Sequence, residues 1–398
     1  MRSHVFACAV LSAAALAAAL GGLETHTATA AQKSTALPVF EVDAKFPTMP
    51  DKMLLGGVGG ATADSHGNVW VFHRPHTLEE GNATENGWGP APPVIEFSST
   101  GKYLQGWGGP SKSGEYQWFN RGGLYSAHVE CQSCSKERRT NGDGRPGSGE
   151  HGIFIDDADN VWLTGNGDGD GHILKFSAQG KFLLQIGKGG VEPDSSDTSH
   201  LSRPASLAVF RNEVFVADGY GNRRIVVFDA TTGAYKRHWG AYGNKPDDKA
   251  SKARVASGQG PQQFNTPHGI TVSNDGIVYV SDRANNRVQS FRLDGTFLKE
   301  GFVKRGSQGT GTTFGVALSP APEQRFLYVA DGSNERIAIL DRTSLEEIGQ
   351  IGGPGRKAGE FFHIHSLGVD PQGNLVTGES QGYRVQKFIY KGLSTAAR

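Results

Sequence analysis

The sequence predicts an all-β protein in which a unit of four strands is repeated six times. Three observations lead to this prediction. Apolar and polar residues alternate over short stretches, and four such stretches align without a gap: 59–70, 151–162, 268–279 and 365–376. Two further copies start at Ala205 and Phe314, once one residue is dropped from the first and three are added to the second. Each copy continues through a polar turn into a third and a fourth strand, and about 40 residues per unit is typical of a blade in a β-propeller.

Composition agrees with a six-bladed β-propeller. The 398 residues include 56 glycines and 18 prolines, which indicates a chain rich in turns. The blades account for about residues 53–391, so we expect residues 31–398 to form a single domain. Forty basic and 40 acidic residues cancel. This balance argues against a nucleic acid or an anionic membrane surface as partner and favours a small or neutral molecule.

The N-terminal region predicts export and closure of the ring. Residues 1–30 combine Arg2, an apolar stretch over 5–20 and the small-residue sequence Ala28-Thr29-Ala30. This pattern is typical of a secretory signal peptide, so we expect a secreted or periplasmic protein without membrane insertion. Residues 38–43 alternate as a strand does, whereas the last repeat lacks a good fourth strand. We therefore expect residues 38–43 to complete the last blade and to cover its open edge.

Two cysteines follow the signal peptide, Cys131 and Cys134. In an oxidising compartment the favoured interpretation is a disulfide that staples the long insertion 108–148. A haem attachment site would need a histidine where Ser135 stands, and a zinc site that also used His128 would lack a fourth ligand. The insertion also carries Trp118, Phe119 and Tyr125, from which we expect an ordered cover over one face of the disc.

Three histidines carry the strongest functional signal. His151, His268 and His365 occupy the same position, the start of the first strand, in blades two, four and six. First strands line the axis of a propeller, so these side chains should lie about 120° apart and point at one spot. Three neutral imidazoles with an open fourth position suit zinc or another divalent transition metal. A single histidine there would be read as an ordinary core residue, and the threefold register is what predicts a metal centre.

Polar residues at the ends of the second strands should face the same side. The recurring Asp218, Asp282 and Asp331 are best read as structural, because aspartate at such a turn accepts backbone N–H groups. Arg74, Arg283 and Tyr220 are candidate site residues. A pair of arginines can hold a carboxylate, and a tyrosine beside a cation is suited to proton transfer.

The residues also show a family resemblance, which covers 38–391. The chain resembles the NHL-repeat propellers and, more narrowly, the peptidyl-α-hydroxyglycine α-amidating lyases. The resemblance is carried by Gly57-Val-Gly-Gly, Val71-Phe-His-Arg74, Glu150-His-Gly, Val216-Ala-Asp-Gly-Tyr220, Thr266-Pro-His-Gly, Ser281-Asp-Arg283 and His363-Ile-His365-Ser. It implies a carbon–nitrogen lyase that cleaves a peptidyl-α-hydroxyglycine to a peptide amide and glyoxylate. It also implies zinc on His151, His268 and His365, with Tyr220, Arg74 and Arg283 as catalytic residues.

The chain departs from the family pattern at several positions. His363 replaces a methionine and offers a possible extra metal ligand, and Gly221 replaces a cysteine. Ser366 replaces an acidic calcium ligand, so the family's structural calcium site, which would also use backbone carbonyls at Val58 and Ile153, is in doubt.

Two other functions remain open from the sequence. A lactonase-type hydrolase on the same fold would normally use carboxylate and asparagine ligands for calcium, whereas the blade starts here offer histidine. A non-catalytic NHL-repeat scaffold that binds protein or glycan is the second alternative, since a fold does not fix a function. The sequence leaves the oligomeric state open.

Overall fold

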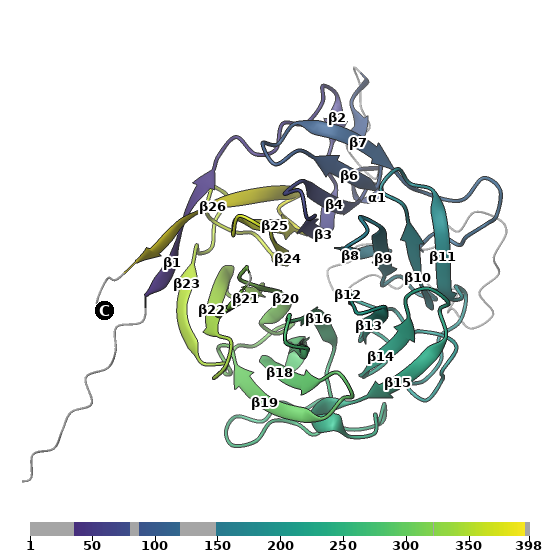
Figure 1. The fold of residues 1–398 in the computed structure, drawn as a ribbon, viewed down its shortest axis with the longest axis vertical. Coiled ribbons are helices and arrows are strands. Elements are labelled where there is room, and N and C mark those ends of the chain that lie inside the picture. Colours follow the sequence, from purple (N-terminus) through teal and green to yellow (C-terminus); the bar gives the residue numbers. More distant parts are fainter. Residues whose placement is uncertain (1–35, 80–86, 120–148, 321, 395–398) are drawn as a thin grey trace, which may run out of the picture.

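A computed structural model describes residues 36–79, 87–119, 149–320 and 322–394. Six four-stranded antiparallel sheets are arranged around a central axis, so the predicted six-bladed β-propeller is confirmed (Figure 1). The predicted signal peptide, residues 1–30, and the predicted disulfide between Cys131 and Cys134 lie outside the described residues. No helix in the described part of the chain combines the length and the apolar character needed to cross a bilayer.

The first three blades follow the chain from the axis outwards. Blade 1 contains β3 (Gly57–Ala63), β4 (Val69–Arg74), β6 (Val94–Phe97) and β7 (Tyr103–Trp107). Blade 2 contains β8 (Glu150–Ile155), β9 (Val161–Gly165), β10 (His172–Phe176) and β11 (Phe182–Gly187). Blade 3 contains β12 (Ser206–Phe210), β13 (Glu213–Asp218), β14 (Arg224–Asp229) and β15 (Tyr235–Trp239).

The last three blades repeat the same order. Blade 4 contains β16 (Pro267–Val272), β17 (Ile277–Asp282), β18 (Arg287–Arg292) and β19 (Phe297–Phe302). Blade 5 contains β20 (Thr313–Leu318), β21 (Phe326–Asp331), β22 (Arg336–Asp341) and β23 (Glu347–Ile351). Blade 6 contains β24 (Ile364–Val369), β25 (Leu375–Glu379), β26 (Arg384–Ser394) and, from the other end of the chain, β1 (Leu37–Asp43). Outside the blades lie β2 (Met53–Leu54), β5 (Gly89–Pro90), α1 (His76–Glu79), η2 (Ala241–Gly243) and η3 (Arg283–Asn285).

The N-terminal strand closes the ring. β1 pairs antiparallel with β26, from Leu37 opposite Ser394 to Asp43 opposite Lys387. Two ends of the chain that are far apart in sequence therefore form one sheet, and β26 has a neighbour on each side. Buried apolar residues fill the spaces between adjacent blades; one core cluster joins Phe314 and Ile339 of blade 5 to Leu367 and Phe388 of blade 6.

The one-residue gap in the third repeat has a local cause. β12 and β13 are joined by the two-residue turn Arg211-Asn212, with Phe210 paired opposite Glu213. Both turn residues have positive φ, 48° and 60°. Such turns match the right-handed twist of the flanking strands, so this hairpin is shorter than its counterparts without any loss of register.

The recurring acidic residue at the end of the second strand forms an ion pair in blades 3 to 6. Asp282 in blade 4 accepts a hydrogen bond from Arg287 Nε at 2.8 Å and another from the Asn265 backbone N–H at 2.7 Å. Both side chains of the pair are fully buried. The equivalent pairs are Asp218–Arg224, Asp331–Arg336 and Glu379–Arg384. The structural interpretation of the aspartates is thus supported, although the arginine partner was not anticipated.

Breaking one of these pairs should destabilise the protein strongly. Arg287→Ala leaves the Asp282 carboxylate buried without its cation, and we expect the free energy of unfolding to fall by about 3–5 kcal/mol, measured by urea titration. Arg342→Ala is the matched control, because its partner Asp275 is largely exposed and such pairs contribute about 0–1 kcal/mol. Equal losses in the two variants would contradict a specific role for the buried pair.

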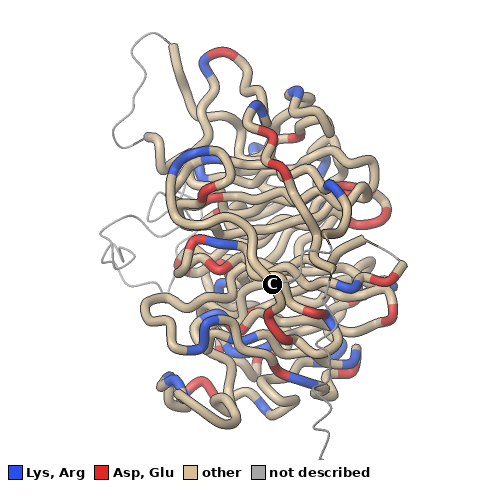
Figure 2. The backbone as a smooth tube through the Cα atoms, turned by 90° about the vertical axis from the view of Figure 1, so that its left-hand side faces the viewer, with Lys and Arg blue, Asp and Glu red and all other residues tan. Residues whose placement is uncertain are grey.

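Lys, Arg, Asp and Glu are mixed along the part of the chain that faces the viewer in Figure 2. Figure 2 shows basic and acidic residues interspersed over one side of the disc. This pattern agrees with the zero formal net charge of the chain.

Candidate metal centre

Three first strands bring the predicted histidines together at the axis. His151 lies in β8, His268 in β16 and His365 in β24, and their side chains are almost completely buried. Their ring centroids are 4.9, 4.6 and 4.8 Å apart, and the ligand atoms all lie within 4.8 Å of one another. Imidazole nitrogens around tetrahedral zinc are about 3.4 Å apart, so these atoms converge on the scale of a single ion.

Each imidazole is oriented by the blade that follows its own. His151 Nδ1 lies 2.6 Å from the Ala205 carbonyl oxygen, His268 Nδ1 lies 3.1 Å from that of Phe314, and His365 Nδ1 lies 2.7 Å from that of Gly59. A carbonyl only accepts hydrogen bonds, so Nδ1 carries the proton in all three rings. Nε2 is therefore the unprotonated nitrogen in each ring, as a metal ligand requires.

The histidines are held in the neutral form. Burial holds the pKa of each imidazole well below its usual value of 6.5. Positive charge on Arg74 lowers the pKa of all three further, and Arg283 does the same for His151 and His268. No proton therefore competes for Nε2 near neutral pH, which suits a divalent transition metal.

The glycine after a histidine makes this orientation possible. A Cβ on Gly152 would lie 2.6 Å from the Ala205 carbonyl oxygen, and a Cβ on Gly269 would lie 2.5 Å from that of Phe314. These are the two carbonyls that accept the imidazole protons. The His-Gly dipeptide therefore lets the neighbouring strand approach closely enough to fix the ring.

Adding one methyl group at this point should weaken metal binding. Gly269→Ala pushes the Phe314 carbonyl away from His268 Nδ1, and losing such an orienting partner typically lowers metal affinity about 10–100-fold. The measurement is a zinc titration in competition with a chromophoric chelator. Gly306→Ala serves as control, because a Cβ there meets no atom within 4 Å. The same zinc affinity in both variants would show that the carbonyl does not tune the site.

Tyr220 lies directly against the histidine cluster. Its hydroxyl oxygen is 3.0 Å from His151 Nε2 and 3.1 Å from His268 Nε2, and it accepts a hydrogen bond of 2.9 Å from Arg283 Nη1. The flanking glycines position it, because a Cβ on Gly219 would lie 1.9 Å from the Pro267 carbonyl oxygen. The turn after β13 is therefore pressed onto the start of β16, and the phenol reaches the axis.

Two guanidinium groups complete the site from opposite blades. Arg283 lies between the rings of Tyr220 and Phe314, with its central carbon 5.1 and 4.9 Å from their centroids. Its buried Nε has no hydrogen-bond partner in the described part of the chain. Arg74, at the end of β4, donates from Nε to the Glu150 carbonyl oxygen at 2.8 Å, and burial lowers the pKa of its guanidinium. Two fixed cations beside a cluster of neutral ligands suit a substrate that carries a carboxylate.

The structure thus brings together all six principal residues expected from the sequence. His363 is not one of the converging metal-ligand groups found among the described residues. Its φ is 59°, and its ring packs edge-on against Phe314 with centroids 5.3 Å apart. The left-handed backbone at His363 thus turns its side chain toward the Phe314 ring.

The residues expected around calcium do not fit that ion. Val58 lies in β3 and Ile153 in β8, next to the histidines. Ser366 offers only a neutral hydroxyl. Its buried Oγ has no hydrogen-bond partner among the residues that the structure describes and would lie 2.5 Å from a Cβ on Gly378. Calcium prefers six to eight oxygen ligands that include carboxylates. In the ranges that the structure covers, the histidines are the single grouping of three or more acidic, cysteine or histidine ligands.

Trp118 and Phe119, in the insertion 108–148, contact residues of blade 2 that the sequence did not identify as their partners. Trp118 Nε1 donates to Glu150 Oε1 at 2.9 Å, and Phe119 stacks on His172 with centroids 5.1 Å apart. A Cβ on Gly165 would lie 2.2 Å from the Phe119 ring. Phe119 therefore occupies the space that the acidic residue fills in blades 3 to 6. A glycine in place of the recurring acid was the signal in the sequence.

Comparisons with known proteins find an NHL repeat in this chain and similarity to proteins named as amidating enzymes. A family model of the NHL repeat matches residues 264–291. The chain is 27% identical over 355 residues to peptidylglycine alpha-amidating monooxygenase of Rattus norvegicus, covering 84% of this chain and 30% of that protein. It is 26% identical over 362 residues to peptidyl-alpha-hydroxyglycine alpha-amidating lyase 1 of Drosophila melanogaster, covering 85% and 58%. It is 33% identical over 143 residues to a probable peptidyl-alpha-hydroxyglycine alpha-amidating lyase of Caenorhabditis elegans, covering 35% and 36%. The chain thus spans less than two thirds of each relative.

Proposed function

We propose that this chain, an NHL-repeat six-bladed β-propeller that resembles the peptidyl-α-hydroxyglycine α-amidating lyases, is a metal-dependent carbon–nitrogen lyase. The observation that carries the proposal is the contact of Tyr220 with two of three converging histidines, while Arg283 donates to the same hydroxyl. The proposed substrate is a peptidyl-α-hydroxyglycine, which is cleaved to a peptide amide and glyoxylate.

His151, His268 and His365 would hold the metal, for which we propose zinc. Three neutral nitrogen donors with room for a further ligand are typical of catalytic zinc sites. When bound, the ion supplies Lewis acidity toward an oxygen of the substrate. The proposal does not include a calcium ion.

The two arginines would position the substrate. Arg74 ends β4 of blade 1 and Arg283 follows β17 of blade 4, on opposite sides of the axis, and a carboxylate between them would gain charge-assisted hydrogen bonds. The Nε of Arg283 has no hydrogen-bond partner among the described residues, so one donor is already available. A carboxylate held there fixes the adjacent carbinol carbon over the histidines and next to the Tyr220 oxygen.

Tyr220 is suited to move the proton. In the proposed reaction Tyr220 acts as the phenolate: its oxygen accepts the proton of the α-hydroxyl, and the carbon–nitrogen bond breaks as the C–O bond gains its second pair. The electron pair of the broken bond stays on the amide nitrogen, which takes a proton back from Tyr220. The hydrogen bond from Arg283 places positive charge beside the phenol oxygen while it is deprotonated. No water is consumed, and atoms and charge balance.

The test is direct. Purified protein loaded with zinc should release glyoxylate from α-hydroxyhippurate, and removal of the metal by a chelator should stop the release. Added zinc should restore it. Zinc binding without glyoxylate release would overturn the lyase proposal and leave a metal-binding propeller with another chemistry.

A further inference from the structure

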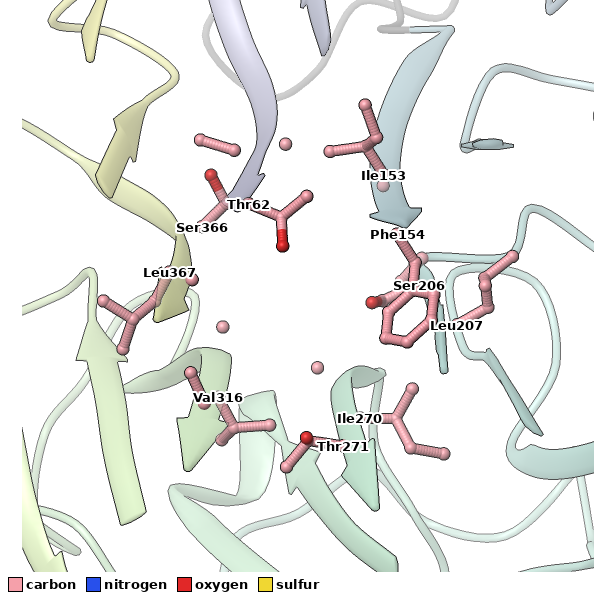
Figure 3. A pocket seen from close by; sticks show the side chains of 18 of the residues that line it. Thr62, Ile153, Phe154, Ser206, Leu207, Ile270, Thr271, Val316, Ser366 and Leu367 are labelled. Atoms are coloured by element: carbon pink, nitrogen blue, oxygen red, sulfur yellow. The ribbon is translucent and has the colours of Figure 1, made fainter. Parts of the chain in front are cut away.

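The axis of the propeller contains a continuous cavity beneath the histidines. It has a volume of about 250 Å³ and is lined by the first strands of all six blades, with His151, His268 and His365 among the lining residues. Figure 3 shows Thr62 of blade 1 and Thr271 of blade 4 on opposite sides of the open centre. The three histidines therefore border open space on their channel side.

The two sides belong to opposite faces of the disc. The start of each first strand pairs with the end of the second, as Gly57 does with Arg74 and Pro267 with Asp282. The histidines, Tyr220 and both arginines therefore lie toward one face. The ends of the first strands, such as Val272 opposite Val278, lie toward the other. A molecule travelling along the cavity reaches the histidines from the face opposite the arginines.

The cavity opens toward that far face. The histidines are 1%, 3% and 5% exposed, whereas Thr62, Thr271 and other residues near the far ends of the strands are half-buried. Immediately beneath the histidines, the first strands carry only glycine or serine: Gly60, Gly152, Ser206, Gly269, Gly315 and Ser366. No large side chain at that level separates the histidines from the cavity.

The side chains that line the cavity favour uncharged ligands over ions. Apart from the three histidines, the lining residues carry no ionisable side chain, and the polar ones are serine, threonine and one glutamine. An ion would lose hydration there without gaining a counter-charge, whereas water and small uncharged molecules find hydroxyl partners. The opposite face carries two guanidinium groups, so the two approaches to the centre differ in charge preference.

We propose that this channel is a second route to the metal centre, which admits water and small uncharged ligands from the face opposite Tyr220, Arg74 and Arg283. It lets water leave when a carboxylate substrate covers the arginine face. The inference rests on the proposed metal site for its destination, but not on the proposed reaction.

The first experiment tests the channel without metal. In Ser206→Cys, the rate of adduct formation at position 206 is followed by peptide mass spectrometry, so that Cys131 and Cys134 do not interfere. After correction for reactivity toward free cysteine, neutral methyl methanethiosulfonate should react at least tenfold faster than its anionic sulfonatoethyl analogue. Adding Thr271→Trp, nearer the far face, should slow the neutral reagent at least tenfold. Thr296→Trp, on an exposed turn of the same blade, is the matched control and should have no effect.

The second experiment tests whether the route reaches the ion. Cobalt(II)-loaded protein is mixed with imidazole at pH 8, and binding is followed by visible absorption. Thr271→Trp should slow imidazole association at least tenfold, while kcat/KM for α-hydroxyhippurate stays within twofold. If Thr271→Trp does not fold, Thr62→Phe places a plug at the same level from the opposite blade.

The outcomes are distinguishable. Equal reaction of neutral and anionic thiol reagents, or no effect of the plug, overturns the channel. A parallel loss of lyase activity in the plugged variant also overturns it, because the substrate would then share the route. Failure to bind cobalt overturns the metal site, whereas the thiol experiment still decides whether the channel admits small molecules.

Discussion

Replacing His268 with alanine is expected to abolish zinc binding and glyoxylate release together. The variant removes one of three converging donors and leaves Phe314 without the imidazole N–H that its carbonyl accepts. A catalytic metal contributes several kcal/mol of transition-state stabilisation, so kcat/KM should fall at least about 1,000-fold. Zinc content is measured by elemental analysis after dialysis, and turnover is measured by release of glyoxylate from α-hydroxyhippurate.

A surface histidine provides the control for this variant. His66 lies at an exposed turn, with 67% of its side chain accessible, and His66→Ala should retain both zinc and activity. If His268→Ala kept its zinc and its turnover, the metal centre would be ruled out and only the propeller architecture would stand. Loss of zinc with turnover intact would instead dissociate the metal from the chemistry.

Tyr220→Phe should separate chemistry from metal binding. Removing one oxygen leaves the three imidazoles and their carbonyl partners in place, so zinc content should be unchanged. Proton transfer by a positioned side chain contributes about 10²–10⁴-fold, and kcat should fall by that factor with little change in KM. The measurement is steady-state kinetics on α-hydroxyhippurate with zinc-saturated protein.

Tyr235→Phe is the matched change, because Tyr235 lies exposed on the outer strand of the same blade and its hydroxyl hydrogen-bonds only to His238 among the described residues. It should leave kcat unchanged. Unaltered turnover in Tyr220→Phe would exclude the phenol as proton carrier. A simultaneous loss of zinc would assign Tyr220 to the metal shell and not to proton transfer.

The repeat made the main features of the site predictable. Because first strands in a propeller share one axis, a register position in the sequence becomes an angular position in space, and alternate-blade histidines must converge. The same logic placed Tyr220, Arg74 and Arg283 on the face of the histidines, since Arg74 ends a second strand and the other two follow one. The position of a residue within the repeat was therefore enough to predict where in the site it lies.

Features outside the repeat were not predictable in this way. Contacts of Trp118 and Phe119 with Glu150, His172 and Gly165 join an insertion to a blade, and no periodicity specifies them. His363 precedes the strand start by one residue, where a positive φ overrides strand alternation and sends the ring toward Phe314. Register alone cannot anticipate a backbone conformation of that kind.

The three imidazole-to-carbonyl contacts would give a bound ion a mechanical role. Each ring belongs to one blade but takes its orientation from the next. The contact between His365 and Gly59 joins blade 6 to blade 1, although the two residues are 306 positions apart in sequence. A change that loosens the packing of blade 6 on blade 1 should free the His365 ring to rotate. A bound ion that holds the three rings in place should in turn strengthen that packing. The zinc affinity should therefore report how firmly blade 6 packs against blade 1.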